Sequence, residues 1–349
     1  MIQFQNVSAT IQGSRILDHI NLTVNDGEFV LLCGESGCGK TTLTRLVNGL
    51  IPHFVKDVEI DGTVTVEGLD IAKSPMYKIA ESVGSVFQNP KTQFFNTDSS
   101  AEIAFGLENI GADWDSMHKR VAKTISDLEI ETLVDRSVFS LSGGEKQLLA
   151  FASVYAMNPQ VYVLDEPSAN LDHAAMGKLR RILEIVKKGG HTVLIAEHRL
   201  SYLSGLADRI VYLKVGRIEK EFTAAEFAVL SESERTAMGL RSICSEEIKI
   251  PERTFMQLNA SLAVRNLSMK RKKRLILNDL SLSANVGDII GIVGKNGSGK
   301  STFCSSLCGL LPTASGEVIF HGRKLSRSAR TKQFGMVMQD VNYQLFRTV

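Results

Sequence analysis

The chain has few of the features that mark a secreted protein. It contains five cysteines among 349 residues, and none of them forms a Cys-x-x-Cys pair. An odd number of scattered cysteines is typical of free thiols in a reducing compartment. The amino-terminal segment MIQFQNVSAT has neither the basic head nor the apolar core of a signal peptide. These absences argue against a disulfide-stabilised, secreted fold.

Long apolar runs and an excess of one charge are also missing. No segment approaches the roughly 18 to 20 apolar residues that span a bilayer, although apolar residues make up 44% of the chain. The net charge is only +2, so bulk charge gives no reason to expect binding to nucleic acid or anionic lipid. The composition is that of an ordinary globular protein of about two domains. Any membrane role would therefore need a partner that spans the bilayer.

The sequence does contain a long internal repeat. GESGCGKTT, which starts at Gly34, returns as GKNGSGKST at Gly294. Upstream, ILDHINLTVNDGE resembles ILNDLSLSANVGD, and downstream, VGSVFQNPKTQFF resembles FGMVMQDVNYQLF. Matching flanks on both sides indicate a duplicated domain rather than a short structural repeat.

The two copies differ in extent. The second copy stops at Val349, and whatever the first copy carries beyond about Thr97 has no counterpart. We predict a complete first domain over residues 1–222, a polar, helix-prone joint over 223–259, and the N-terminal part of a second domain over 260–349. Either the chain is a fragment of a longer protein, or it pairs through the first copies of two chains.

Three short apolar runs predict the core of the first copy. They are EFVLLCG, VYVLDE and TVLIAEH, at Glu28–Gly34, Val161–Glu166 and Thr192–His198. Continuous apolar runs suit parallel strands buried on both faces. Helix-like stretches lie between them, so the sequence predicts an α/β fold. Ligands of such sheets bind at the carboxyl ends of the strands, where the polar residues of interest stand.

Both repeats of the glycine-rich motif fit G-x-x-x-x-G-K-[ST], and each stands between a predicted strand and a helix. Such a loop directs backbone N–H groups toward phosphate, and the next helix adds its positive N-terminus. Lys40 and Lys300 would reach the β- and γ-phosphates, and the Thr41 and Ser301 hydroxyls would bind Mg²⁺. The expected nucleotide contacts are Gly34, Glu35, Ser36, Gly37, Cys38, Gly39, Lys40, Thr41 and Thr42, and, in the second copy, Gly294, Lys295, Asn296, Gly297, Ser298, Gly299, Lys300, Ser301 and Thr302.

Four further residues of the first copy follow predicted strands. Asp165 would hold Mg²⁺ through water, because a carboxylate at a buried strand end needs a cation or water. Glu166 would polarise the attacking water as general base. His198 would contact the γ-phosphate. Gln88 could touch Mg²⁺ or the attacking water, although a plain structural role remains equally open, and Gln339 holds the matching position in the second copy.

Taken together, these motifs resemble the nucleotide-binding subunit of an ABC ATPase. The resemblance rests on the Gly34 loop, Gln88, LSGGEKQ at Leu141, VYVLDEP at Val161, SANLD at Ser168 and His198. It implies a P-loop NTPase core with a helical signature subdomain, and ATP and Mg²⁺ as cofactors.

In that family the signature caps ATP held by a facing domain. The resemblance therefore implies that Ser142, Gly143 and Gly144 offer hydroxyl and backbone N–H groups to a γ-phosphate at a helix N-terminus. Another ABC nucleotide-binding domain is needed to complete each site. The second copy has no signature, no strand ending in Asp-Glu and no matching histidine, so pairing the two copies with one another would leave both sites incomplete.

A narrower resemblance is to the ATPases of energy-coupling factor importers. It rests on QNPKTQ from Gln88 to Gln93, followed by Phe94 and Phe95, on AEHRL at Ala196, and on the duplication. It implies uptake of a vitamin or a transition-metal ion through a coupling subunit and a substrate-binding membrane protein, at the cytoplasmic face of the membrane. The stretches SATIQGS and SMKRKKR lack the aromatic residue on which such domains usually stack adenine.

Two other functions stay open at this level. One is a soluble ABC ATPase that acts on ribosomes or DNA, although the long charged linker and the coiled-coil insertion of such relatives are missing. The other is a remnant that binds ATP without turnover. The sequence does not name a transported substrate.

Overall fold

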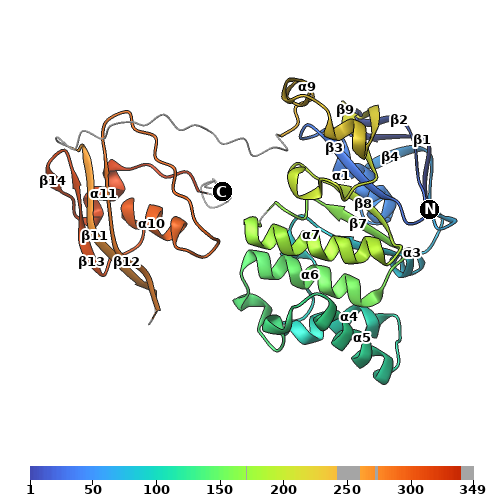
Figure 1. Ribbon diagram of the computed structural model, residues 1–349, viewed down its shortest axis with the longest axis horizontal. Helices are drawn as coiled ribbons and strands as arrows, with labels where there is room; N and C mark the ends of the chain where they lie inside the picture. The colour runs from blue at the N-terminus through green and yellow to red at the C-terminus, as the bar shows by residue number, and fades with distance from the viewer. Residues whose placement is uncertain (170, 242–259, 272–273, 339–349) are drawn as a thin grey trace. The chain divides into compact units, whose positions relative to one another are not determined.

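The chain forms two compact units, Met1–Ile248 and Lys249–Val349. The computed structural model (Figure 1) describes the following residues: 1–169, 171–241, 260–271 and 274–338. Helices α8 (Ala224–Ala228) and α9 (Glu232–Ala237) lie in the stretch expected to be a joint, but they belong to the first unit.

A six-stranded sheet forms the centre of the first unit. Its strand order is β10-β9-β3-β8-β7-β6, and every neighbouring pair is parallel except β10 with β9. The strands are β3 (Phe29–Gly34), β6 (Val83–Val86), β7 (Val161–Asp165), β8 (Thr192–Ala196), β9 (Arg209–Lys214) and β10 (Arg217–Thr223). The three predicted strands are thus confirmed as β3, β8 and β7, which are adjacent.

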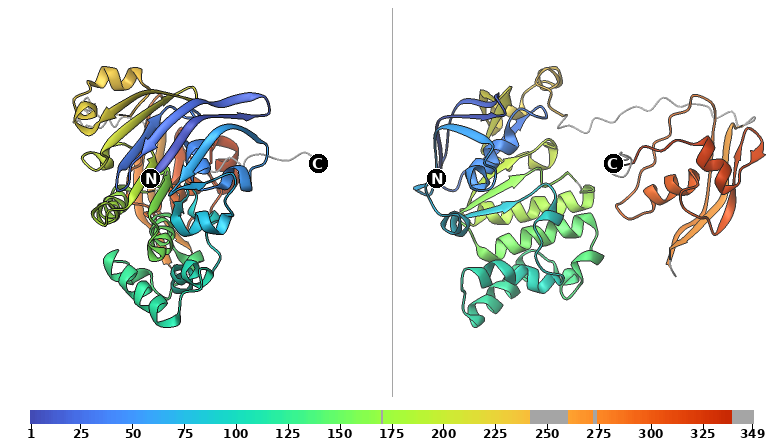
Figure 2. Two further views of the ribbon diagram at one scale, coloured as in Figure 1. Left: turned by 90° about the vertical axis from the view of Figure 1, so that its right-hand side faces the viewer. Right: turned by 180° about the vertical axis from the view of Figure 1, so that it is seen from behind.

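The apolar runs are continuous because both faces of this sheet are covered. On β3, Phe29, Leu31 and Cys33 belong to one core, and Val30 and Leu32 belong to another on the opposite face. The first core includes residues of α6 and α7, and the second includes α1 and the small sheet of the unit (Figures 1 and 2). Alternating side chains of one strand therefore enter two cores.

Helices and short 3₁₀ turns connect the strands. The α-helices of this region are α1 (Lys40–Val47), α2 (Leu50–His53), α3 (Met76–Ser82), α4 (Ser99–Asn109), α5 (Trp114–Asp127), α6 (Gly143–Met157) and α7 (His173–Lys188). The 3₁₀ turns are Pro90–Thr92, Glu131–Leu133, Val138–Ser140 and Ser201–Leu203. Helices α4, α5 and α6 pack on one another and form the helical part of the unit (Figure 1).

A second, antiparallel sheet covers α1. Its order is β2-β1-β4-β5. The strands are β1 (Ile2–Ile11), β2 (Ser14–Val24), β4 (Val58–Val66) and β5 (Leu69–Asp70). Its apolar side chains, with those of α1, pack against the central sheet.

The second unit contains a sheet of the same order, β12-β11-β13-β14. Its elements are β11 (Leu262–Arg271), β12 (Arg274–Ala284), α10 (Lys300–Leu307), β13 (Ser315–Phe320), β14 (Arg323–Lys324) and α11 (Arg327–Gln333). Its core is small and centres on side chains such as Leu267, Phe303 and Val318.

The strand expected before the second glycine-rich loop does not form. Residues 288–295 have no strand pairing, and Ile289 and Val293 are 99% and 91% exposed. In the first unit, β3 pairs with β8 and β9, which lie much later in the chain. Among the described residues of the second unit no such neighbours exist, so the backbone N–H and C=O groups of this segment have no partners with which to form a sheet.

We predict that Phe151→Ala destabilises the first unit by about 3 to 5 kcal/mol, because a buried aromatic side chain leaves a cavity. Phe151 is fully buried on α6 and stacks on Tyr162 of β7, with ring centroids 6.0 Å apart. The measurement is urea unfolding followed by circular dichroism. Phe139→Ala is the control, since Phe139 is 77% exposed; equal losses in the two variants would contradict the assigned core.

Candidate functional site

The first glycine-rich loop joins β3 to α1 in a closed conformation. Gly34, Gly37 and Gly39 have φ values of 144°, 81° and 106°, which favour glycine. A Cβ atom on Gly34 would lie 2.2 Å from the Leu213 carbonyl oxygen. The Nζ of Lys40 donates to the carbonyl oxygens of Gly34 and Glu35, at 2.9 Å each. The loop thus wraps around its own lysine at the N-terminus of α1.

The carboxyl end of β7 lies beside this loop. The Thr41 hydroxyl donates to Asp165 Oδ1 at 3.0 Å. Burial raises the pKa of the Asp165 carboxyl, and the charge of Glu166 adds to that rise, whereas the hydrogen bond from Thr41 opposes it. A partly desolvated carboxylate next to a hydroxyl is a suitable pair of ligands for Mg²⁺. Within the described residues no group of three His, Cys, Asp or Glu side chains could hold a metal ion, so other ligands would have to complete such a site.

Glu166 stands between two of the other expected residues. Its Oε2 accepts a hydrogen bond from Gln88 Nε2 at 2.9 Å, and its Oε1 lies 3.1 Å from His198 Nε2. Its own φ is 45°, an unusual value for a non-glycine residue. The backbone N–H of Glu166 donates to the Ala196 carbonyl at 2.8 Å. The ends of β6, β7 and β8 thereby bring the three side chains together.

Sequence reasoning missed Glu197, which holds the segment after β8. This buried carboxylate accepts the backbone N–H groups of His198 and Arg199 at 2.7 and 3.0 Å. Its other oxygen accepts the Tyr202 hydroxyl at 2.9 Å and the Ser168 N–H at 3.3 Å. The available sequence signal is that Glu197 is a charged residue at the end of an apolar strand, and this residue enters the sequence-based prediction only within the AEHRL motif.

The His198 ring titrates in a crowded electrostatic environment. Burial lowers the pKa of the ring, and the positive charges of Lys40 and Arg241 lower it further. The charges of Glu166 and Glu197 oppose this effect without cancelling it. The ring therefore stays neutral to lower pH than a free histidine does, and its Nε2 faces Glu166 Oε1.

The signature segment caps α6 and stands apart from this cluster. Ser142 and Glu145 form a capping box, with the Glu145 carboxylate accepting the Ser142 N–H at 2.7 Å. A Cβ atom on Gly143 would meet nothing within 4 Å, so this face of the turn is open. Within the described residues, Ser142, Gly143 and Gly144 make no hydrogen bond to the Gly34 loop. The structure therefore does not bring the signature to the loop of its own unit.

The segment after Gln88 is shaped by two further side chains. Gln93 folds back, with its amide donating to the Ser85 carbonyl at 3.0 Å and accepting from Phe87 N–H at 3.3 Å. Buried Glu102 on α4 accepts the N–H groups of Phe95 and Asn96, at 3.1 and 2.7 Å. These bonds present Phe95 on the surface.

Helix α6 is linked to the same segment. Gln147, from the signature LSGGEKQ, donates through Nε2 to the Phe87 carbonyl at 3.3 Å. Phe95 is 75% exposed and stacks on Phe105, with centroids 4.8 Å apart. A movement of the Gln88 segment would thus change contacts both at Glu166 and at the signature helix α6.

The second glycine-rich loop has the same internal bonds. Lys300 Nζ donates to the Gly294 and Lys295 carbonyls at 2.7 and 2.8 Å. Gly299 has a φ of 99° and precedes α10. Asn296, Gly297, Ser298, Ser301 and Thr302 lie in the loop and at the start of α10. Gln339 lies outside the described residues.

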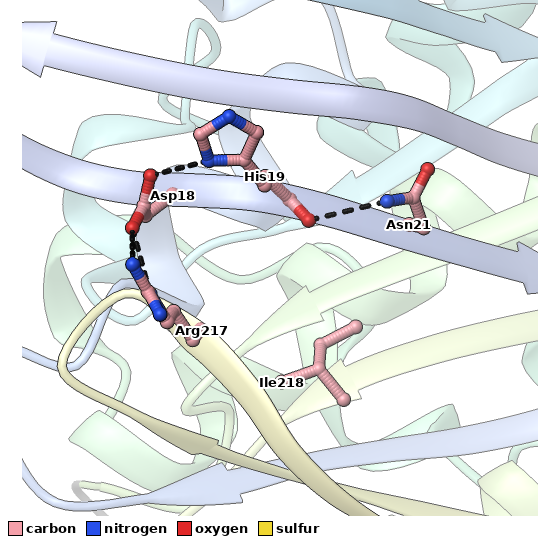
Figure 3. A pocket seen from close by; sticks show the side chains of 5 residues that line it. All are labelled: Asp18, His19, Asn21, Arg217 and Ile218. Carbon is pink, nitrogen blue, oxygen red and sulfur yellow. Dashed lines mark hydrogen bonds and ion pairs between the residues drawn. The ribbon is translucent and has the colours of Figure 1, made fainter.

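A surface hollow of about 410 Å³ lies between β2 and β10 (Figure 3). Asp18 in its wall binds Arg217 and accepts from Arg15 Nη1 at 2.8 Å, and the His19 Nδ1 lies 2.6 Å away. Hydrogen bonds from Arg217 and His19 lower the pKa of Asp18. The Asp18 carboxylate thus pairs with Arg15 and Arg217. The hollow contains none of the expected site residues. These ion pairs connect β2 to β10.

The turn between β9 and β10 contacts the first glycine-rich loop. The Gly216 N–H donates to the Cys38 carbonyl at 3.2 Å, and the Asp18 N–H donates to the Gly216 carbonyl at 2.8 Å. A Cβ atom on Gly216 would lie 2.4 Å from the Ile16 carbonyl oxygen. The turn between β9 and β10 therefore fastens the small sheet to the loop.

Known proteins are similar to this chain in sequence. An ABC transporter ATP-binding protein of Treponema denticola is 43% identical over 354 residues, which cover 99% of this chain and 72% of that protein. A relative in Clostridium perfringens is 32% identical over 392 residues and is covered to 68%.

Two solved structures of ABC proteins are also similar to this chain. CbiO1 of Clostridium perfringens, described as part of the ABC transporter complex CbiONQ, matches with a TM-score of 0.59 and 29% identity, over 67% of this chain and 91% of that chain. The bacterial ABC transporter cassette MJ0796 matches with a TM-score of 0.56 and 24% identity, over 64% and 99% of the two chains, and shares the fold.

No helix in the described part of the chain is long and apolar enough to cross a membrane.

The match to the family model identifies the family of the chain. The model of the ABC transporter family matches residues 17–169 and 277–349, which include both glycine-rich loops and the signature. The chain therefore belongs to the ABC transporter family and is an ATP-binding, ATP-hydrolysing subunit with the P-loop α/β fold.

Proposed function

We propose that the chain powers an importer of the energy-coupling factor type, taking up a vitamin or a transition-metal ion. The observation that carries this proposal is the segment from Gln88 to Phe95. It joins the Glu166 carboxylate, through Gln88, to the exposed Phe95, which stacks on Phe105 of α4. The likeness to CbiO1, a part of the CbiONQ complex, supports the same class.

In this proposal ATP binds with its phosphates on the Gly34 loop. Lys40 exchanges its carbonyl contacts for the β- and γ-phosphate oxygens, and the backbone N–H groups of residues 35–41 surround the phosphates. Thr41 and Asp165 would hold Mg²⁺, with Gln88 near by; the ion would neutralise charge on the β- and γ-phosphates. In the second unit Lys300 and Ser301 take the matching parts, and Gln339 that of Gln88.

Glu166 would act as the general base. A water molecule attacks the γ-phosphorus, the bond to the oxygen bridging the β- and γ-phosphates breaks, and the water proton passes to the Glu166 carboxylate. ADP and inorganic phosphate leave. His198 would hold the γ-phosphate through Nε2, and Gln88 would orient the water. Gln88 and His198 both contact Glu166, which places the carboxylate between the group proposed to orient the water and the group proposed to hold the γ-phosphate.

The signature would serve another nucleotide-binding domain. Ser142 and the open face at Gly143 are available to a phosphate from outside the unit, where the N-terminus of α6 favours negative charge. We propose that ATP binds between such domains, and that hydrolysis releases them. The transmembrane partners, a coupling subunit and a substrate-binding protein, would place this subunit at the cytoplasmic face of the membrane.

Glu166→Gln is expected to lower the rate of ATP hydrolysis by about 10²- to 10⁴-fold, the usual contribution of a general base. ATP binding should persist, because the amide keeps the size of the side chain, and the closed dimer should accumulate. Phosphate release and size-exclusion chromatography with ATP measure the two effects. Glu219→Gln, at an exposed site on β10, is the control. Normal turnover in Glu166→Gln would remove Glu166 from the role of base.

The pKa of His198 is expected below the ordinary histidine value of about 6.5, and Glu166→Gln should lower it further, because an attractive negative charge is lost. NMR titration of the ring protons, assigned with His198→Asn, measures both values.

The same shift has a consequence for stability. The unfolded chain protonates this histidine at a higher pH than the folded chain does, so the contribution of His198 to stability is complete above about pH 6.5 and declines as pH falls toward the folded pKa. A His198 pKa above 6.5 would contradict the assigned surroundings.

Phe95→Asp is expected to reduce recovery of the protein in the membrane fraction of source cells, and to leave basal ATP hydrolysis within about twofold, since a charge disrupts an apolar contact but lies outside the phosphate loop. Val229→Asp is the control, because Val229 is 82% exposed and lies elsewhere. Recovery with ribosomes instead of membranes would contradict the importer proposal.

A further inference from the structure

The residues after β10 fold back onto the first unit. Thr223 caps α8 and Ser231 caps α9, each through a capping box. Phe227 is buried against Phe222, with ring centroids 5.7 Å apart. The buried Arg235 guanidinium donates to the Phe227 and Ala228 carbonyls at 3.1 Å each. This segment is therefore a packed part of the first unit.

A tight turn ends α9 and carries the chain to the phosphate loop. The N–H groups of Gly239 and Leu240 donate to the Thr236 and Arg235 carbonyls, at 2.9 Å each. Met238 and Leu240 pack against the larger core of the unit. These contacts fix the position of Gly239 from both sides.

Gly239 lies directly against the glycine-rich loop. Its φ is +66°, and a Cβ atom at this position would lie 2.5 Å from Glu35 Cγ and 2.7 Å from Glu35 Oε1. Glu35 is the residue whose carbonyl receives the Lys40 ammonium. The turn therefore lies against the Glu35 side chain of the loop, and its positive φ favours glycine.

Arg241 follows two residues later and is exposed. Within the described residues its guanidinium forms no hydrogen bond or ion pair. Its charge is one of those that lower the pKa of His198, together with that of Lys40. The charges of Arg241 and Lys40 thus both act on the His198 ring, and a phosphate in this region would be attracted by both cations.

We propose that Arg241 contacts the terminal phosphate of ATP bound at the first phosphate loop, which makes the turn at 238–241 part of the ATP site. The proposal rests on the proposed placement of ATP on the Gly34 loop. A guanidinium suits this task because its fork of donors matches phosphate oxygens. ADP lacks the terminal phosphate and would leave Arg241 unpaired.

The test compares binding of adenylyl imidodiphosphate, a non-hydrolysable ATP analogue, with binding of ADP by calorimetry. All variants carry Lys300→Ala, which silences the second loop. Arg241→Ala should weaken binding of the analogue about tenfold, the loss expected for one charge-assisted hydrogen bond, and change ADP binding less than about twofold. Arg241→Lys should restore part of the loss. Arg181→Ala, at an exposed arginine of α7, should change neither.

The outcomes distinguish the proposed role of Arg241 from the proposed placement of ATP on the Gly34 loop. Unchanged binding of the analogue in Arg241→Ala, or equal weakening of the analogue and ADP, would overturn the role of Arg241. In that case Lys40→Ala still abolishing binding would leave the Gly34 site intact. If Lys40→Ala also bound normally, the placement of ATP would itself be wrong. Because Arg241 has no packing role, unaltered thermal unfolding of Arg241→Ala is expected.

Discussion

The site depends on the parallel pairing of three buried strands, β3, β8 and β7. Parallel neighbours end at the same edge of a sheet, so Leu32, Ala196 and Asp165, which are far apart in sequence, lie side by side, and β3 then ends at Gly34. Their pairing is enforced by two cores, one on each face. A polar segment follows each strand at this edge, and the charged groups of the proposed catalytic cluster lie at the strand ends or directly after them.

The second unit shows what that pairing contributes. Its glycine-rich loop closes around Lys300 as the first closes around Lys40. The loop conformation is therefore local, set by glycines and by one lysine. The strand before it is not local. Residues 289–293 are apolar like β3, yet they form no strand, because the described residues of the second unit include no neighbouring strands to pair with their N–H and C=O groups.

The charged groups at the sheet edge are held mainly by contacts to neutral hydrogen-bonding groups. Glu166 is held by Gln88 and His198, while Glu197 is committed to backbone N–H groups of the same region. Lys40 is occupied by carbonyl oxygens rather than by a carboxylate. Only the carbonyl contacts are weak enough, relative to a phosphate, to be exchanged readily when nucleotide binds. Lys40 is therefore available to a phosphate, whereas the Glu166 carboxylate already has hydrogen-bonding partners.

Much of this could be read from the sequence. The apolar runs gave the parallel strands because burial on both faces leaves no alternation, and the spacing of glycine, lysine and threonine defined the loop because its chemistry is contained in consecutive residues. LSGGEKQ and QNPKTQ were recognisable for the same reason.

Tertiary structure alone decided how distant segments meet. Contacts such as Gln88 with Glu166, Glu197 with the Ser168 N–H, and Gly239 with Glu35 join residues separated by long and unequal stretches of chain. Residues 223–241 illustrate the limit, because their polar composition suggested a joint, whereas the buried Phe227 and Arg235 pack them onto the first unit. Sequence determined the local chemistry of each motif, and the fold determined which motifs share a site, because only packing fixes positions between segments that no short-range rule connects.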